Sequence, residues 1–237
     1  MKNRTFSALT VAAFLAASAA LVGCSKQAPE QGEQKTSAPA SDVIKIGVFQ
    51  PLTGANSAGG ADELEGIKLA NKLYPTALGK KVELVIVDNK SDKVEAANAA
   101  TVLTQKEKVN AVLGSWGSSL SMSGGPIFAE AKIPAVALSA TNPNVTKGNE
   151  YYFRVCFLDP FQGTVGAAYA YNTLKAKKVA IIREVSNDYS VGLTKFFVDN
   201  FVKLTGDDKA VVATADYNTG DQDFSAQLTN IKQHNPA

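Results

Sequence analysis

The chain has 237 residues, of which 45% are hydrophobic and 19% are charged, which is the composition of a globular protein and not of a fibrous or wholly disordered one. Its formal net charge of +2 argues against a large nucleic-acid-binding surface, and we expect no nucleic-acid partner. One histidine and two cysteines exclude a multi-histidine metal site and a four-cysteine zinc site, and we expect neither a metal nor another cofactor.

Residues 1–23 have the parts of a secretory signal peptide, because Lys2 and Arg4 precede an uncharged, mostly apolar run. That run is too short to span a membrane comfortably. It ends in Leu-Val-Gly-Cys, and small residues before a cysteine at this place resemble the lipobox of bacterial lipoproteins. The resemblance implies that cleavage makes Cys24 the lipid-modified N-terminus. The alternative is a chance cysteine after an ordinary signal peptide.

Residues 24–41 lack large apolar side chains and are rich in Pro, Gln, Ala and Ser, which predicts a flexible linker. A linker between a lipid and a folded domain would hold that domain outside the cytoplasm, on the outer face of a bacterial membrane. Cys156 then has no intrachain partner. Because it lies in an apolar run, we predict a buried and inert thiol.

From residue 43 onward, strand-like segments alternate with segments that have helical spacing. The predicted strands are 43–49, 81–87, 109–113, 135–138, 151–157, 179–182 and 210–215, and the predicted helices are 62–74, 92–105, 120–131, 161–174, 189–204 and 224–232. Asp92 is the expected N-cap of the second helix, and Pro126 is expected to delay or kink the third. The alternation predicts an α/β fold with parallel sheets and right-handed crossovers.

Because the alternation continues past residue 158, we predict two lobes, a first over 42–158 and a second over 159–237. The second contains fewer strand–helix units than the first. We therefore expect this chain to be a C-terminally truncated part of a longer one, with an incomplete second lobe. A naturally small second lobe is the alternative.

Ligands of open parallel sheets bind beyond the carboxyl ends of the strands, so the loops there are candidate sites. The loop over 51–60 is rich in glycine, but Gly60 and Ala61 stand where a phosphate-binding loop needs Lys and Ser or Thr. A glycine-rich turn that leads into a helix is the better interpretation.

The loop GSWGSS, residues 114–119, holds the only tryptophan, Trp116, and places Ser118 before a predicted helix. Hydroxyls and free backbone N–H groups at a helix start suit a carboxylate, and Trp116 beside them could cover an apolar group. The alternative is that Ser118 only caps the helix while Trp116 packs in the core. The motif G-x-S-x-G is absent, which argues against a hydrolase that uses Ser118 as its nucleophile.

A second hydroxyl-bearing loop, Ser139-Ala-Thr-Asn-Pro143, follows the fourth strand and would face the first. We expect Ser118 and Thr141, with backbone N–H groups, to bind a carboxylate, and the Ser139 carbonyl to accept from an ammonium group. The loop could instead be a turn with an Asn cap. In the second lobe, Tyr189 opens a helix, where it could close over the ligand or pack locally.

The runs IKIGVFQPLTGANSAGG, GSWGSS, SATNPNVT and YYFRVCFLDPFQG resemble the periplasmic-type binding proteins of branched-chain amino acid ABC importers, including the leucine/isoleucine/valine-binding proteins and their lipoprotein relatives. The resemblance covers residues 43–237. It implies a type I periplasmic-binding fold with two Rossmann-like lobes that close on a free amino acid about a hinge near 157–161. It also implies delivery of the ligand to a membrane permease, without catalysis.

Matching loop to loop, the resemblance implies binding positions in both lobes. The implied ligand-binding residues are Trp116, Ser118, Ser139, Ala140, Thr141 and Tyr189. One relative has an aromatic residue where this chain has Ala58, and Trp116 would fill part of that space. The acidic residue of the second lobe that binds the ammonium group would fall beyond residue 237. A sensor domain for an amino acid or a small amide is the alternative function.

Overall fold

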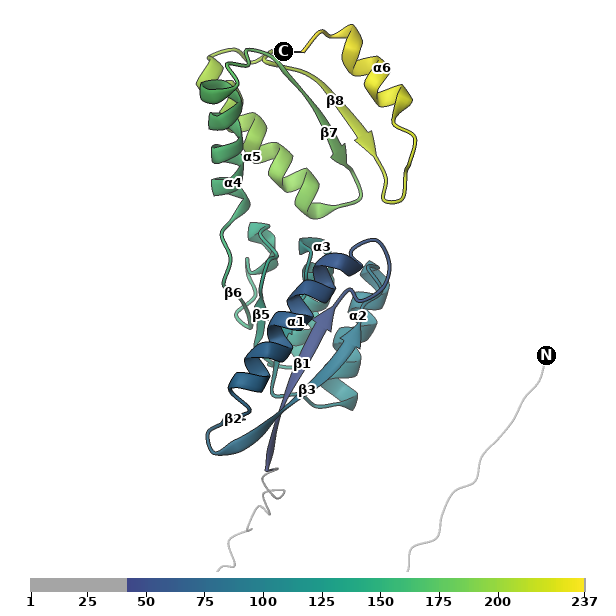
Figure 1. The fold of residues 1–237 in the computed structure, drawn as a ribbon, viewed down its shortest axis with the longest axis vertical. Helices are drawn as coiled ribbons and strands as arrows, with labels where there is room; N and C mark the ends of the chain where they lie inside the picture. The colour runs from purple at the N-terminus through teal and green to yellow at the C-terminus, as the bar shows by residue number, and fades with distance from the viewer. Residues whose placement is uncertain (1–41, 237) are drawn as a thin grey trace, which may run out of the picture. The chain divides into compact units, whose positions relative to one another are not determined.

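The structure is a computed structural model that describes residues 42–236. These residues form two α/β lobes, one on a six-stranded sheet and one on a two-stranded sheet (Figure 1). The predicted signal peptide, the predicted linker and Cys24 lie outside the described residues. Within them, no helix combines the length and the apolar character that a membrane span requires.

The first lobe is built on a six-stranded sheet with the strand order β2-β3-β1-β4-β5-β6. The strands are β1 (Val43–Gln50), β2 (Thr76–Ala77), β3 (Lys80–Asp88), β4 (Ala111–Gly114), β5 (Ala135–Ala137) and β6 (Tyr152–Arg154). Every pair is parallel except β2 with β3, which is antiparallel and involves a strand that the sequence analysis did not predict. The connection from β3 to β4 passes β1, so the strand order reverses beside β1, where open α/β sheets bind ligands.

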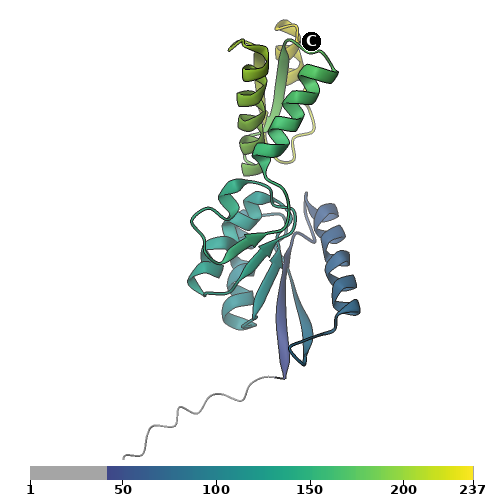
Figure 2. The same cartoon turned by 90° about the vertical axis from the view of Figure 1, so that its left-hand side faces the viewer.

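Helices cover both faces of this sheet (Figure 2). On one face lies α1 (Ser57–Leu73), whose Leu64 and Ile67 pack against Val48 of β1. On the other lie α2 (Lys93–Thr101), its π-helical continuation η1 (Val102–Lys106) and α3 (Ser118–Glu130). The predicted N-cap is confirmed, because the Asp92 carboxylate accepts from the N–H groups of the first turn of α2 at 2.8 and 2.9 Å.

In the first lobe, two helix starts were predicted too late for the same reason. Helix α1 begins at Ser57 and not at residue 62, and its first turn includes Gly60, where a Cβ would come within 2.1 Å of the Pro51 carbonyl oxygen. Helix α3 begins at Ser118 and continues through Pro126. Residues that disfavour helix in isolation are accepted here because tertiary packing outweighs intrinsic propensity.

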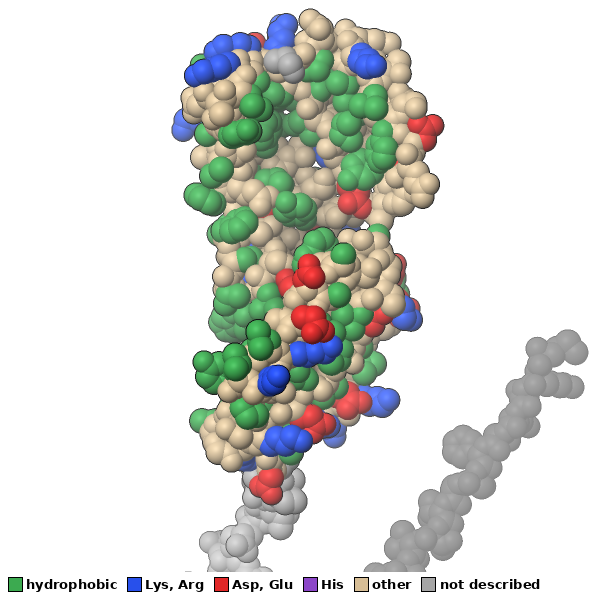
Figure 3. Space-filling view, viewed as in Figure 1, with side chains coloured by type: hydrophobic (Ala, Val, Ile, Leu, Met, Phe, Trp, Pro, Cys, Tyr) green, Lys and Arg blue, Asp and Glu red, His purple; other side chains and the backbone are tan. Residues whose placement is uncertain are grey.

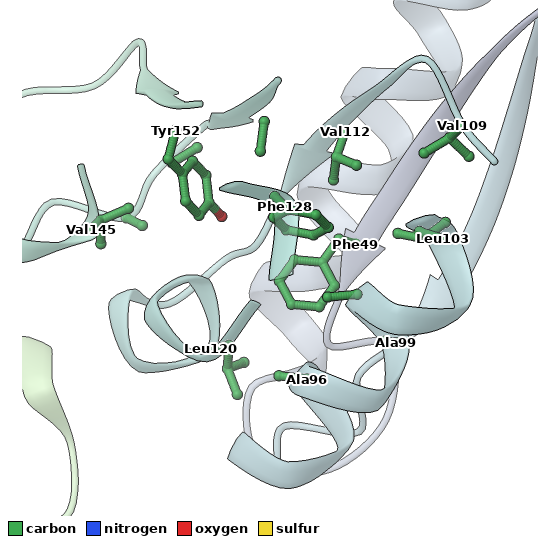
Figure 4. Close-up of a cluster of buried hydrophobic side chains, with 14 residues drawn as sticks. Phe49, Ala96, Ala99, Leu103, Val109, Val112, Leu120, Phe128, Val145 and Tyr152 are labelled. Carbon is green, nitrogen blue, oxygen red and sulfur yellow. The ribbon is translucent and has the colours of Figure 1, made fainter. Parts of the chain in front are cut away.

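The centre of the first lobe is an aromatic cluster (Figure 4). Phe128 of α3 meets Phe49 of β1 and Tyr152 of β6 edge to face, with ring centroids 5.5 and 6.0 Å apart. The Tyr152 hydroxyl donates to the Gly114 carbonyl oxygen at 2.7 Å, which satisfies its buried polar end. The cluster therefore ties the outer strand β6 to the end of β4, directly before the loop that contains Trp116.

A carboxylate at the end of β3 holds the loop that follows β1. Asp88 accepts from the Thr53 hydroxyl at 2.6 Å and from the Leu52 N–H at 2.8 Å. Burial would raise the pKa of Asp88, but the hydrogen bonds from the Thr53 hydroxyl and from nearby backbone N–H groups hold it below its usual value.

We expect Asp88→Asn to destabilise the protein in a pH-dependent way. Because the pKa of Asp88 is depressed in the folded state, its contribution is present above the unfolded-state value of 3.8 and is lost as the pH falls through the folded-state value. Urea unfolding from about pH 7 down to about pH 2 should show the largest difference between wild type and variant at neutral pH, and a shrinking difference in acid. A constant difference across this range would contradict the role of the charge.

The second lobe continues the alternation. Its elements are α4 (Asp159–Ala168) with the π-helical η3 (Tyr169–Thr173), β7 (Val179–Glu184), α5 (Asp188–Thr205), β8 (Val211–Tyr217) and α6 (Ser225–Gln233). Strands β7 and β8 are parallel, as predicted. The buried core is small, with Phe201 as its largest side chain, and Ile182 and Leu228 remain exposed. Apolar side chains are also visible on the face of this lobe that Figure 3 shows.

The segment between the lobes differs from the prediction. Strand β6 ends at Arg154 and not at residue 157, because the chain leaves the sheet there and passes through 155–158 into α4. Cys156, predicted to be buried, is only half-buried and is a free thiol. Burial raises the pKa of this thiol, which opposes formation of the reactive thiolate.

Candidate functional site

A cavity of about 610 Å³ lies where loops of the two lobes meet, a volume in the usual range for small-molecule sites. Its wall includes Trp116, Ser118, Ser119, Ser139 and Thr141 from the first lobe and Glu184, Asn187, Tyr189 and Thr219 from the second. Every predicted binding residue except Ala140 lines it. Ala140 is fully buried, and its carbonyl oxygen accepts from the Arg154 guanidinium at 2.8 Å.

The start of α3 forms one part of the wall. The N-cap is Gly117, at a φ of +90° that favours glycine, and no side chain caps the first turn. The Ser118 hydroxyl instead accepts from the Asn142 N–H at 3.1 Å, so it joins the loop after β4 to the loop after β5. The open first turn presents backbone N–H groups that favour an anionic group.

Trp116 lies against the start of α1 and is half-buried. A Cβ at Gly59 would come within 2.3 Å of the Trp116 indole, so the absence of a side chain at this position makes room for the ring. The backbone N–H of Trp116 donates to the Gln50 side-chain oxygen at 2.7 Å. This bond holds the loop that carries the ring at the cavity wall.

We expect Gly59→Ala to displace the Trp116 ring, because a methyl group at this position overlaps the indole. The measurement is the fluorescence emission of the protein, which has a single tryptophan. Gly66→Ala is the matched control on the same helix, since a Cβ there meets no atom within 4 Å. The same emission maximum in both variants and in wild type would count against the contact.

Side chains of β6 and α1 hold the loop that follows β5. The Arg154 guanidinium donates to the carbonyl oxygens of Ala140 and Asn142, both at 2.8 Å. The Ser139 hydroxyl donates to Glu63 of α1. These contacts hold Ser139 and Thr141 at the cavity while their neighbour Ala140 faces the interior.

The Thr141 hydroxyl is buried near the carboxylate of Asp159. It makes no hydrogen bond of normal geometry within the described residues, and neither do the two side-chain oxygens of Asp159 at the start of α4. Burial raises the pKa of Asp159, and the nearby Thr141 hydroxyl and Arg154 guanidinium only partly offset this rise. Unpaired buried polar atoms are costly, and atoms of this kind commonly bind a ligand or water.

The second lobe brings Tyr189 to the cavity at the start of α5. Asn187 caps this helix, its side-chain oxygen accepting from the Tyr189 N–H at 3.0 Å. The Tyr189 hydroxyl accepts from the Gln162 side chain at 2.7 Å. The bond from Gln162 of α4 therefore positions the aromatic side chain that α5 carries.

Asp188, next to Tyr189, connects the two lobes. Its N–H donates to the Ser119 hydroxyl at 2.8 Å, and its carbonyl oxygen accepts from the Asn142 side chain at 2.8 Å. Its carboxylate pairs with Lys93 of α2 at 2.9 Å. Burial would raise the pKa of Asp188, but the bonds to Lys93 and Ser119 lower it. Each first-lobe partner is itself beside the cavity or in its wall.

An acidic residue of the second lobe also reaches the wall. Glu184, at the end of β7, accepts from the Asn187 side chain at 3.0 Å and from the Thr219 hydroxyl. The sequence analysis placed the ammonium-binding acid beyond residue 237 and did not single out Glu184. Within residues 42–236, no group of three His, Cys, Asp or Glu side chains lies close enough together to hold a metal ion.

Several residues that build the site had no signal in the sequence. Gln50, Glu63, Asn142, Asp159 and Asp188 contact or adjoin the loops that line the cavity, Asn142 and Asp188 through their backbone N–H groups. Of these five, only Asn142 was given a possible role, as a turn cap. That role is confirmed, because its side chain accepts from the Asn144 N–H at 2.9 Å.

Known proteins resemble this chain in sequence and in fold. An amino acid binding protein of Pseudomonas aeruginosa is 34% identical over 81% of this chain and 51% of that protein. The crystal structure of a leucine-binding protein, LivK, of Thermotoga maritima matches with a TM-score of 0.78 and 46% identity, over 81% of this chain and 54% of that one.

The structure of a third relative was solved with a bound ligand. The branched-chain amino acid substrate-binding protein LivJ of Streptococcus pneumoniae, solved with isoleucine, matches with a TM-score of 0.74 and 34% identity, over 82% of this chain and 55% of that one. The chain thus spans about half the length of the relatives it matches. The sequence model of the periplasmic binding protein family matches residues 43–237, nearly all of the described part. The fold is accordingly the type I periplasmic-binding fold, and the chain belongs to the periplasmic binding protein family.

Proposed function

We propose that this protein is the substrate-binding component of an ABC importer and that it binds a branched-chain amino acid in the cavity between its lobes. The observation that carries the proposal is the meeting of the uncapped start of α3 with the buried Thr141 hydroxyl in one cavity wall. The isoleucine bound to the Streptococcus pneumoniae relative supports the choice of ligand class.

The head group of an amino acid fits the chemistry of this wall. The first turn of α3, with the hydroxyls of Ser118 and Thr141, offers donors to a carboxylate. The carbonyl of Ser139 is the proposed acceptor for the ammonium group. Tyr189 would cover the ligand from the second lobe, and closure about the segment 157–161 would complete the enclosure.

The side chain of the ligand would contact the apolar part of the wall, to which Trp116 contributes. Each buried CH₂ adds about 0.8 kcal/mol, so a pocket of this kind favours leucine over alanine by roughly 2 kcal/mol. Hydrophobic burial on closure therefore gives the expected preference for leucine, isoleucine or valine.

The cellular setting belongs to the same proposal. We propose residues 1–23 as a signal peptide, Cys24 as a lipid-modified residue and 24–41 as a linker that holds the lobes, 42–158 and 159–237, outside the cytoplasm. The partner is then the permease of the importer, which receives the ligand without any reaction being catalysed. The names of the relatives are those of binding proteins and not of enzymes, which supports this expectation.

Isothermal titration calorimetry of the purified protein against the twenty amino acids tests the proposal. We expect saturable binding of L-leucine, L-isoleucine or L-valine and weak or no binding of charged amino acids. If none of the twenty amino acids binds, the proposed function is rejected. Intact-mass analysis of the membrane-associated protein tests the lipid on Cys24, and an unmodified N-terminus at another residue contradicts that part alone.

A further inference from the structure

Glu63 lies on α1, outside the set of predicted binding residues, and both of its carboxylate oxygens are used. Oε2 accepts from the Gln50 side-chain amide at 2.6 Å, and Oε1 accepts from the Ser139 hydroxyl. Gln50 is fully buried at the end of β1, and its own side-chain oxygen accepts from the Trp116 N–H at 2.7 Å. One carboxylate is therefore connected to two of the loops that form the first-lobe wall of the cavity.

The direction of these hydrogen bonds requires an acceptor at both oxygens of residue 63. Ser139 donates its hydroxyl proton, and Gln50 donates through its amide because its oxygen already accepts from Trp116. Only an ionised carboxylate accepts at both of its oxygens without presenting a donor. Hydrogen bonds to a charged acceptor are also about twice as strong as bonds between neutral groups.

No cation offsets this charge, since the ion pairs of the described residues do not include Glu63. Burial raises the pKa of Glu63, and the hydrogen bonds from Ser139 and Gln50 lower it in part. Stabilisation of the charge thus depends on these two neutral donors, which ties the position of each loop to the carboxylate.

We propose that Glu63 is a positioning residue for ligand binding, which sets the places of Ser139 and Trp116 through the contacts Ser139–Glu63–Gln50–Trp116. The inference rests on the proposed function, because both loops are proposed to contact the amino acid. Glu63 itself does not line the cavity. It acts through the two residues that do.

Glu63→Gln tests the proposal with little change in shape. An amide at this position removes the charge, and the contact to Ser139 persists only if the Ser139 hydroxyl turns to accept from the new NH₂ group. Two hydrogen bonds to a charged acceptor thus become weaker bonds between neutral groups. We expect a shifted emission maximum of Trp116 in the ligand-free protein and at least about tenfold weaker L-leucine binding, as follows from losing a hydrogen bond to a charged group. Glu65→Gln is the matched control, since Glu65 is exposed on the same helix and pairs only with Lys68 in the described residues.

A folded Glu63→Gln variant with wild-type emission and wild-type affinity would overturn the proposal. If that variant does not fold, amide hydrogen exchange of the wild-type protein decides. We expect the Trp116 backbone N–H and the Gln50 side-chain amide to be protected from exchange. If both exchange as fast as in an open loop, the proposal is also overturned. Emission and exchange are measured without ligand, so they test the role of Glu63 independently of binding. If the wild-type protein binds no amino acid, that result rejects the proposed function and leaves these two measurements valid.

Discussion

Replacement of Ser118 by alanine is expected to weaken binding of L-leucine by about 10- to 100-fold. Two contacts are lost together, because the hydroxyl is a proposed donor to the ligand carboxylate and is also the acceptor for the Asn142 N–H. A hydrogen bond to a charged group contributes about 1.5–3 kcal/mol, and each 1.4 kcal/mol corresponds to about tenfold in affinity. Calorimetry with L-leucine measures the change directly.

Ser123→Ala is the control for this substitution. Ser123 lies on the same helix, α3, but its hydroxyl donates to the Ser119 carbonyl oxygen at 3.0 Å and does not line the cavity. We expect this variant to bind like wild type. Wild-type affinity in Ser118→Ala, in a protein that does bind L-leucine, would remove the Ser118 hydroxyl from the binding site.

Replacement of Phe128 by alanine is expected to cost about 3–5 kcal/mol of the free energy of unfolding, which is about a fifth or more of the stability of a typical domain. Phe128 is fully buried and contacts both Phe49 and Tyr152 edge to face, so truncation leaves a cavity where three elements meet (Figure 4). Urea unfolding followed by circular dichroism gives the measurement.

Leu78→Ala is the matched large-to-small control, because Leu78 is 95% exposed. Its expected effect lies within about 0.5 kcal/mol of zero. A loss below about 1 kcal/mol in Phe128→Ala would mean that the core collapses around the missing ring. Since Tyr152 also bonds to Gly114 before the Trp116 loop, we expect the Phe128 variant to shift the Trp116 emission as well.

The order of strands and helices was predictable because hydrophobic periodicity is a local signal. Runs such as 43–49 and 81–87 appear as β1 and β3 with ends that move by a residue or so, and Asp92 caps α2 as its position indicated. The parallel pairing followed from the alternation alone. The early start of α1 was missed because glycines that disfavour a helix locally are accommodated by packing against Pro51.

The loops that line the cavity were predictable as well, since the carboxyl ends of parallel strands meet at one edge of the sheet. That rule brought Trp116, Ser118, Ser139 and Thr141 to one cavity without knowledge of the tertiary structure, and Tyr189 joined them from the second lobe. The same rule does not tell which residue of a loop faces inward, and so it did not separate Ala140 from its neighbours.

The sequence by itself determined the fold class, the two loops and the family, because each depends on residues that are close together in the chain. The tertiary structure decided how those loops are held. Glu63 meets Ser139 across 76 residues, and Asp188 meets Ser119 across 69. Contacts of this kind depend on the distance between folded elements and on the direction of individual donors and acceptors. A local pattern of hydrophobic and polar residues specifies neither the distance nor the direction.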